Sequence, residues 1–334
     1  MPSLDTRPPL YRRLERLSES IAQDAVVVSA AVTGRIAGVR QALFLEEVLS
    51  STRLAGFSLD PAAGAALLSR GVAVGGERLA VYEAVADYAE ASRLIEGADA
   101  RPLRPHIYLR TEEILELHRR AMHRTARTAG AWREHNLPAV PSGLVPPPHW
   151  LVPREIAAFV DRYAGGPPAE VLPLLWVARA HMRILRIQPF EGGNGRVARL
   201  VMNFLLRRLG LPAAAFDGRR MQQYPEVLAA GDAGDPLPLA ALVVESVRER
   251  MTRLLGALAE EELRPLRDFV PKERLAALVK AAQRGRLRVV RRGARFLTTA
   301  AWLADYESAA PPRSKGTTPS SPERPSSAHV GGAA

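Results

Sequence analysis

The segment IQPFEGGNGRVAR, residues 187–199, places a glycine-rich turn directly before two arginines and a helical pattern. The apolar residues after the glycines recur at spacings of three and four, which predicts a helix that ends at Gly210. Free backbone N–H groups and the helix dipole make such a helix start a binding site for an anion. Arg196 and Arg199 lie three residues apart, so both guanidinium groups can contact a phosphate from the first turn. By itself the pattern is equally compatible with a plain turn between two helices.

The elements around this loop are predicted to be helices, because apolar spacings of three and four prevail and strand-like alternation is scarce. Glycines near the ends and prolines near the starts support the boundaries. The predicted helices cover residues 80–97, 112–123, 154–165, 168–187 and 238–263. The loop therefore joins two helices, and we expect a mainly α fold.

Between two of these helices, residues 130–153 contain six prolines. Prolines lack the N–H that a helix needs and restrict the residue before them, so an extended segment or hairpin is favoured. We expect this stretch to form a flap or lid.

Composition excludes several kinds of site. The 334 residues include no cysteine, which excludes disulfides, thiolate zinc sites and cysteine nucleophiles. The seven histidines form no HxxxH or HExxH pair, which argues against a histidine metal site. No signal peptide or membrane-spanning stretch is evident, so we expect a cytoplasmic protein without a membrane partner.

Taken with its flanks, the loop resembles the signature of the Fic (Fido-domain) family, H-P-F-x-[D/E]-G-N-G-R-x-x-R. The residues that match in register are Pro189, Phe190, Gly193, Asn194, Gly195, Arg196 and Arg199. The resemblance extends over roughly residues 40–258, with the proline-rich stretch as the flap and residues 219–243 as C-terminal helices. It implies a Fic-type helical bundle with a short β-hairpin flap.

The resemblance also implies an activity, the transfer of AMP from Mg-ATP to a hydroxyl group of a target protein. In that family the signature histidine accepts the proton and the acidic residue holds Mg²⁺. By position, the nucleotide phosphates would contact Gly193, Asn194, Gly195, Arg196 and Arg199. The flap, here residues 138–153, pairs with the target segment as a strand does. The expected ligands are thus ATP or another nucleotide, and a target protein.

Two positions depart from the signature. Gln188 stands where the histidine belongs, and an amide cannot act as a general base near neutral pH. Gly192 stands where the acidic metal ligand belongs, so Mg²⁺ has lost its carboxylate unless the neighbouring Glu191 supplies one. His181, two helical turns before the loop, is interpreted as a packed helix residue, with a replacement base as the alternative.

A third departure lies near the N-terminus. One class of Fic proteins has an inhibitory helix with the pattern S-x-x-x-E-G, whose glutamate pairs with the second signature arginine. The matching segment here runs from Ser51 to Gly56, and Ala55 stands in place of the glutamate. The resemblance therefore implies a regulatory segment without its inhibitory carboxylate, and an ordinary amphipathic helix is the alternative.

The C-terminal region carries most of the basic charge. Residues 264–307 contain eleven Lys/Arg and four Asp/Glu, a net +7 within the chain's +11. The pattern predicts a helix that ends at Gly285, a hairpin that turns at Arg292–Gly293, and a helix capped by threonine. This order resembles excisionase/MerR-type winged-helix modules, which implies contacts with DNA phosphates. The residues expected to make them are Arg284, Arg286, Arg288, Arg291, Arg292 and Arg295.

We therefore expect an N-terminal helical region (1–105), a Fic core (106–258), a basic winged-helix-like module (259–308) and a disordered tail (309–334). The leading functional hypothesis is nucleotide binding with AMP transfer lost or strongly weakened. Two alternatives stay open. One is an adenylyltransferase that still works with a non-standard base, and the other is a DNA-binding regulator that uses the Fic domain as an interaction scaffold.

Overall fold

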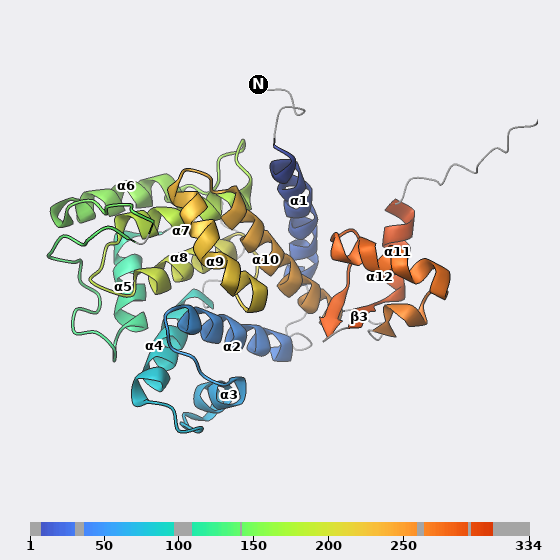
Figure 1. Cartoon of the computed structure of the whole chain (residues 1–334), viewed down its shortest axis with the longest axis horizontal. Helices are drawn as coiled ribbons and strands as arrows, with labels where there is room; N and C mark the ends of the chain where they lie inside the picture. The colour runs from blue at the N-terminus through green and yellow to red at the C-terminus, as the bar shows by residue number, and fades with distance from the viewer. Residues whose placement is uncertain are drawn as a thin grey trace, which may run out of the picture. The chain divides into compact units, whose positions relative to one another are not determined.

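The computed structural model describes residues 8–30, 37–96, 109–140, 142–258, 264–292 and 295–309. The chain forms two compact units, Met1–Glu262 and Leu263–Ala334 (Figure 1). Most of the predicted tail lies outside the described residues, as does the predicted boundary at residue 105. None of the helices in the described ranges is long and apolar enough to span a membrane.

The first unit is built from helices, in agreement with the mainly α prediction. Its α-helices are α1 (Pro9–Ala30), α2 (Ala37–Leu54), α3 (Pro61–Arg70), α4 (Leu79–Glu96), α5 (Thr111–Ala121), α6 (Val152–Ala164), α7 (Pro173–Ile187), α8 (Asn194–Arg208), α9 (Gly218–Asp232) and α10 (Leu237–Leu258). A short 3₁₀ helix, η4 (His149–Leu151), precedes α6.

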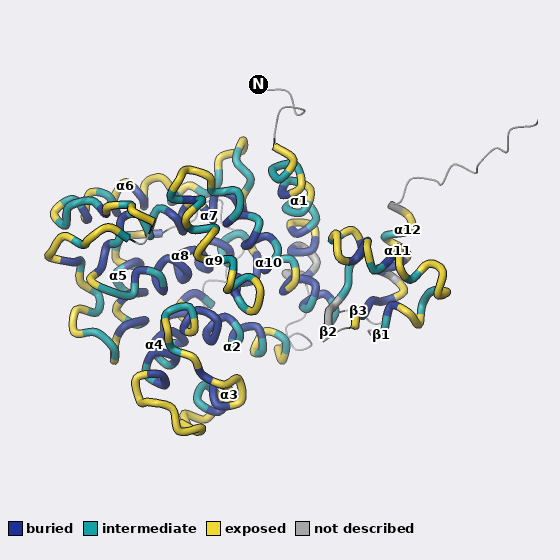
Figure 2. Tube along the Cα trace, viewed as in Figure 1, coloured by how far each residue is buried: buried dark blue, intermediate teal, exposed yellow. Residues whose placement is uncertain are grey.

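Helix α8 lies at the centre of this unit and packs against α2, α4, α5 and α7. It is buried along most of its length (Figure 2). The sequence predicted one apolar face, but polar residues on the other faces are buried too, including Asn203 at 1% exposure. A helix that is enclosed on all sides must satisfy such groups internally, and Asn203 does so through Ala214 and Glu47. The glycine-rich loop is therefore attached to the most enclosed helix.

The predicted β-hairpin flap is not formed. In the described part of residues 138–153 no strand is present, and a tight turn ahead of the prolines and of η4 is closed by backbone hydrogen bonds. The Val140 N–H donates to the Leu144 carbonyl at 2.9 Å, and the Gly143 N–H donates to the Val140 carbonyl at 2.8 Å. Residues 146–148 are prolines, which have no N–H to continue a ladder. The flap is an extended segment with a turn.

The second unit contains a three-stranded antiparallel sheet in the order β1-β3-β2 and two α-helices. Its elements are β1 (Arg264–Pro265), η5 (Leu266–Asp268), α11 (Lys272–Gln283), β2 (Val290–Arg292), β3 (Arg295–Thr298) and α12 (Ala300–Ala309). Leu266, Leu278, Leu287 and Leu303 form its core.

The local predictions for this unit are confirmed. Gly285, one residue beyond the C-cap Arg284 of α11, has a positive φ of 71°. At the start of α12 the Trp302 N–H donates to Thr299 Oγ1 at 3.2 Å. In the hairpin, Arg292 of β2 pairs with Arg295 of β3, and the predicted turn between them is outside the described residues. Strand β1 was not predicted, because two residues carry no periodic pattern.

Candidate phosphate-binding site

The loop between α7 and α8 begins at a strained residue. Gln188 has φ 47° and ψ 61°, and it is the one non-glycine residue in the described ranges with a positive φ. This left-handed conformation costs about 1–2 kcal/mol for a residue with a side chain. It is held by the Gln188 N–H, which donates to the Ile184 carbonyl at 3.0 Å, and by Nε2, which donates to the Leu185 carbonyl at 2.8 Å. The amide side chain thus points back toward α7.

The other end of the loop requires glycine. Gly193 has φ 75°, and a β-carbon there would lie 2.5 Å from Sδ of Met122. Asn194, the first residue of α8, is 6% exposed and closes the turn: its Nδ2 donates to the Phe190 carbonyl at 2.8 Å, and its Oδ1 accepts from the Phe190 N–H at 3.0 Å. The sequence assigned Asn194 to the ligand, and in the structure its amide atoms hold the loop.

Two arginines occupy the first turns of α8. Arg196 is 6% and Arg199 5% exposed, and Arg196 Nη1 donates to the Ala121 carbonyl at 3.2 Å. Burial and the nearby Arg199 charge lower the pKa of Arg196 to about 10, so it stays protonated at neutral pH. The Arg196 Nε is buried without a hydrogen-bond partner. A β-carbon on Gly195 would come within 3.3 Å of Arg199 Nη1, so this guanidinium group lies over the start of the helix.

The end of α2 lies against these arginines, as the predicted regulatory segment requires. Arg199 Nε donates to Ser51 Oγ at 2.7 Å, and its Nη2 donates to the Ser51 carbonyl at 2.9 Å. The guanidinium group of Arg196 lies 5.5 Å from the centre of the Phe57 ring, a cation–π contact. Ala55 has no side-chain hydrogen-bonding group, so α2 holds Arg199 through a hydroxyl and a carbonyl instead of a carboxylate.

The candidate base and metal ligands are not gathered at the loop. His181 is fully buried and its Nε2 lies 2.7 Å from the Tyr224 hydroxyl, as expected for a packed helix histidine. Glu191 is exposed, and its Oε1 accepts from the Glu134 N–H at 3.2 Å. Across the described ranges, no three His, Asp or Glu side chains are grouped in a way that could hold a metal ion.

Residues 108–206 match the Fic/DOC family model. Over this segment the chain is similar to Fic/DOC family proteins. The chain is 24% identical over 254 residues to the protein adenylyltransferase Fic of Culex quinquefasciatus. The aligned region covers 75% of this chain and 49% of that protein. The corresponding Drosophila melanogaster protein is 25% identical over 253 residues, 75% of this chain and 49% of the relative. The chain thus spans about half the length of these curated relatives.

Solved structures agree on the fold. Fic-1 (residues 134–508) of C. elegans superposes with a TM-score of 0.63 at 20% identity, over 73% of this chain and 72% of that one. A Fic domain-containing signalling protein of Bacteroides thetaiotaomicron gives a TM-score of 0.61 at 21% identity, over 72% and 98% of the two chains. At these identities the likeness establishes a Fic-like fold only.

Two residues that hold the loop between α7 and α8 (residues 188–193, called the Fic loop below) were not recognised in the sequence. His118 of α5 is 1% exposed and stacks on Phe190 at a ring-centre distance of 3.6 Å. Its Nδ1 accepts from the Gly130 N–H at 2.9 Å, so the proton of the neutral ring is on Nε2, which donates to the Gly192 carbonyl at 3.1 Å. A single histidine on a predicted helix gives no indication in the sequence that it will hold a distant loop.

Arg133 is the second such residue, and it joins the Fic loop to the flap. Its side chain is 2% exposed. Nε donates to the Gln188 carbonyl at 2.7 Å, Nη1 to the His135 carbonyl at 2.9 Å, and Nη2 to the Pro147 carbonyl. Its own N–H donates to the Pro189 carbonyl at 3.0 Å. Burial lowers the pKa of Arg133, and the planar guanidinium fork satisfies carbonyls on both sides.

The six basic residues expected to contact DNA are all in the second unit. Arg284, Arg286 and Arg295 are exposed. Arg288 is half-buried, with Nη1 3.7 Å from Asp305 Oδ2. Arg291 and Arg292 are in β2, and their side chains lie outside the described ones.

We predict that Arg133→Met lowers the free energy of unfolding by about 3 kcal/mol, because several buried carbonyls lose their donor at about 1–3 kcal/mol each. Arg133→Lys should lose less, since an ammonium group restores part of the bonding. Urea unfolding measures both. Arg154→Met, at an exposed position of α6, is the matched control and should change the free energy by less than about 0.5 kcal/mol. An Arg133→Met effect as small as the control would contradict this role.

Stability should also fall in mild acid. Burial lowers the pKa of His118 to about 4 from an ordinary value of 6.5. A group whose pKa is lower in the folded state contributes its full stabilisation at pH values above its unfolded pKa. The stabilisation that neutral His118 contributes is therefore lost as pH falls from 6.5 toward 4. We predict that His118→Gln is more destabilising in urea unfolding at pH 7 than at pH 4.5. His135→Gln, at an exposed site, should show no such trend. A pH-independent effect of His118→Gln would contradict the pKa assignment.

Proposed function

We propose that the Fic loop of this chain binds the phosphates of ATP or another nucleotide, and that AMP transfer to protein hydroxyls is lost or strongly weakened. The observation that carries the proposal is the buried pair Arg196 and Arg199 at the start of α8. Two protonated guanidinium groups, beside the positive end of a helix dipole, favour an anionic ligand. The relatives are named protein adenylyltransferases, which supports a nucleotide as the source of that anion.

The absence of a general base at position 188 supports the proposal that AMP transfer is weakened. Gln188 has no titratable group, and its amide nitrogen is bonded to the Leu185 carbonyl rather than directed toward a substrate. A positioned general base contributes typically 10²–10⁴-fold to the rate of proton transfer. His181 is a poor substitute, since its ring is buried and its Nε2 contacts the Tyr224 hydroxyl. Transfer would then depend on water to accept the proton.

The metal position supports the same conclusion. Gly192 offers only backbone atoms, and its carbonyl accepts from His118. Glu191 is exposed and accepts from the Glu134 N–H, which directs its carboxylate toward the segment that leads into the flap. Mg²⁺ that enters with ATP would keep phosphate and water ligands, without a carboxylate from the signature position. The alternative of a working enzyme needs Glu191 to leave its present contact.

The flap supports a protein partner. Val145 and Trp150 are large apolar residues of this segment that are 71% and 64% exposed. Val145 lies in backbone without regular structure, which can pair with an incoming strand, and Trp150 lies in the short helix η4. A target segment that pairs there would lie close to the Fic loop, because Arg133 joins the two.

The test is incubation with ATP labelled on the α-phosphate, with Mg²⁺, followed by detection of label on protein. The natural chain should transfer little or no label, while Gln188→His with Gly192→Asp should raise transfer by at least about 10²-fold. Glu191→Gln in the natural chain is the matched control and should leave the signal unchanged. Label transfer by the natural chain at the level of the double variant would contradict the loss of activity.

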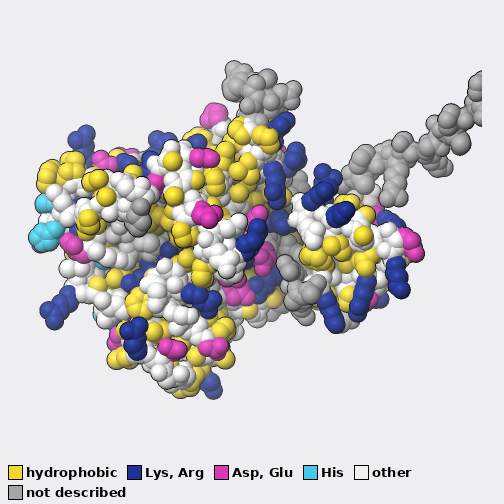
Figure 3. All heavy atoms as spheres, in the orientation of Figure 1, with side chains coloured by type: hydrophobic (Ala, Val, Ile, Leu, Met, Phe, Trp, Pro, Cys, Tyr) yellow, Lys and Arg dark blue, Asp and Glu magenta, His cyan; other side chains and the backbone are white. Residues whose placement is uncertain are grey.

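DNA binding by the second unit is a second candidate function. Between Lys280 and Arg295 the chain has seven Lys/Arg and no Asp/Glu, and this run spans the end of α11 and the β2–β3 hairpin. Several basic side chains are visible on one face of the unit (Figure 3). Such a stretch, with a helix and a hairpin that both carry exposed arginines, suits contacts with DNA phosphates.

We predict that the full chain binds duplex DNA with an affinity that falls with salt, and that Arg284→Ala with Arg286→Ala lowers the salt slope by about 2. Gel-shift titrations over a range of salt concentrations measure this. Arg70→Ala with Arg78→Ala removes two exposed arginines from the first unit and is the charge-matched control. Equal effects of the two double variants, or no DNA binding, would remove this function.

A further inference from the structure

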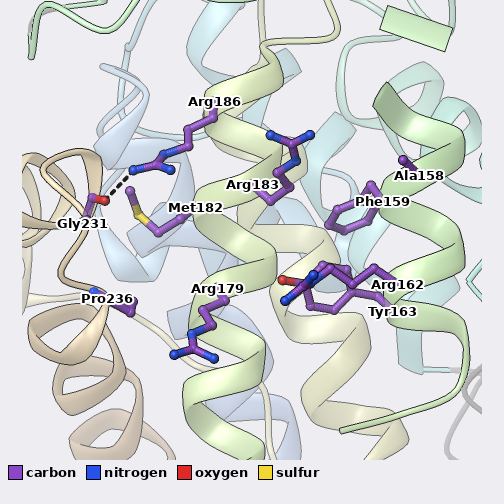
Figure 4. A pocket seen from close by; sticks show the side chains of 11 residues that line it. Ala158, Phe159, Arg162, Tyr163, Arg179, Met182, Arg183, Arg186, Gly231 and Pro236 are labelled. Carbon is purple, nitrogen blue, oxygen red and sulfur yellow. Dashed lines mark hydrogen bonds between the residues drawn. The ribbon is translucent and has the colours of Figure 1, made fainter. Parts of the chain in front are cut away.

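A groove on the first unit lies on the face of α7 that carries Arg179, Met182, Arg183 and Arg186 (Figure 4). It has a volume of about 480 Å³ and is bounded by α6 on one side and by residues 231–236 on the other. The spacing of these residues, three or four apart, places them on one face of the helix. Other α7 residues pack against α8, which starts the phosphate site. The groove is therefore distinct from the Fic loop.

The groove carries four arginines, and carboxylates of the chain pair with two of them. Arg183 pairs with Glu155, and Arg186 lies 3.8 Å from Asp232 and donates to the Gly231 and Asp232 carbonyls. Arg162 and Arg179 are exposed, and within the ranges that the structure describes neither has a carboxylate within 4.0 Å. Two guanidinium groups are thus left to an external anion.

The floor of the groove is apolar except for the Tyr163 hydroxyl. Phe159 and Met182 are buried at 1% and 5% exposure, and Tyr163 lies beside them at 2%. Burial raises the pKa of the Tyr163 hydroxyl, while the charges of Arg162, Arg179 and Arg183 act in the opposite direction. These three guanidinium groups, from two different helices, thus act on one hydroxyl, and Arg162 is hydrogen-bonded to it.

We propose that this groove binds an extended acidic segment of a protein partner, with carboxylates on Arg162 and Arg179 and an apolar side chain over Phe159 and Met182. The shape and the charge favour this occupant. From Arg179 to Arg186 the arginines extend for two turns of α7, about 10 Å, and the volume is in the range of about 300–1,000 Å³ that suits ligands larger than a single ion. Carboxylates form bidentate pairs with arginine. The proposal does not rest on nucleotide binding at the Fic loop.

The test uses a fluorescein-labelled peptide of ten glutamates with one central leucine, titrated with the full chain and followed by fluorescence anisotropy. Arg162→Ala with Arg179→Ala should weaken binding by about tenfold, and the peptide with glutamine in place of glutamate should not bind. Both arginines are exposed, so the variant should retain its unfolding temperature, which is measured alongside.

Two charge-matched variants locate the contact. Arg70→Ala with Arg78→Ala, and Arg284→Ala with Arg286→Ala, should each change the affinity by less than about twofold. Equal losses of peptide affinity in all three double variants would mean nonspecific attraction to a basic protein. A loss of affinity only in the Arg284/Arg286 variant would place the contact in the second unit. Displacement of the peptide by an oligothymidine of equal charge, with the same dependence on Arg162 and Arg179, would assign the groove to nucleic acid. Each of these results, or no binding, overturns the proposal.

Discussion

Two buried like charges, Arg196 and Arg199, dominate the physical chemistry of the Fic loop. Each guanidinium group is buried, and burial together with the Arg199 charge lowers the pKa of Arg196. The compensating groups are weak ones: the Ala121 carbonyl, the Ser51 hydroxyl and carbonyl, and the Phe57 ring. Asp87, whose charge acts on Arg196, is itself bonded to Arg124 at 2.6 Å. The site is therefore left with positive charge that the proposed phosphate would neutralise.

The pair can bind a ligand only if the loop in front of it keeps one conformation. Hydrogen bonds from side chains to the loop backbone hold this conformation. His118, Arg133 and Asn194 together bind carbonyl and N–H groups at both ends of the turn. Each of them holds the backbone of the loop through a side-chain hydrogen bond. We infer that the geometry for phosphate has been kept, while the groups that the family uses for proton transfer and metal binding are absent from Gln188 and Gly192.

The sequence was sufficient for the helices around the loop and for the register of the loop, whereas α1 and α3 were not predicted as separate helices. The contact between Ser51 and Arg199 was not predicted either, because the resemblance gave this arginine a glutamate as its partner. Periodicity predicts long helices well, and the spacing of glycines and arginines in a short signature is specific. The roles of His118 and Arg133 could not be predicted, because their partners are carbonyls far away in the chain, and backbone groups leave no trace in sequence. For the flap, the prolines predicted an extended segment or hairpin and the resemblance implied a hairpin. The described residues form an extended segment with a turn, since proline removes the donors that a ladder needs. Asn194 was assigned to the ligand from the signature alone, and the structure shows its amide bonded to Phe190.

The central claim is that the loop binds nucleotide phosphate through Arg196 and Arg199 without a protein-bound metal. Calorimetric titration of the natural chain with ATP tests it most directly, once with Mg²⁺ and once with a chelator in its place, and with adenosine as the ligand that lacks phosphates. The account predicts that ATP binds in both conditions and that adenosine does not. Absence of ATP binding, or equal binding of adenosine, would contradict it.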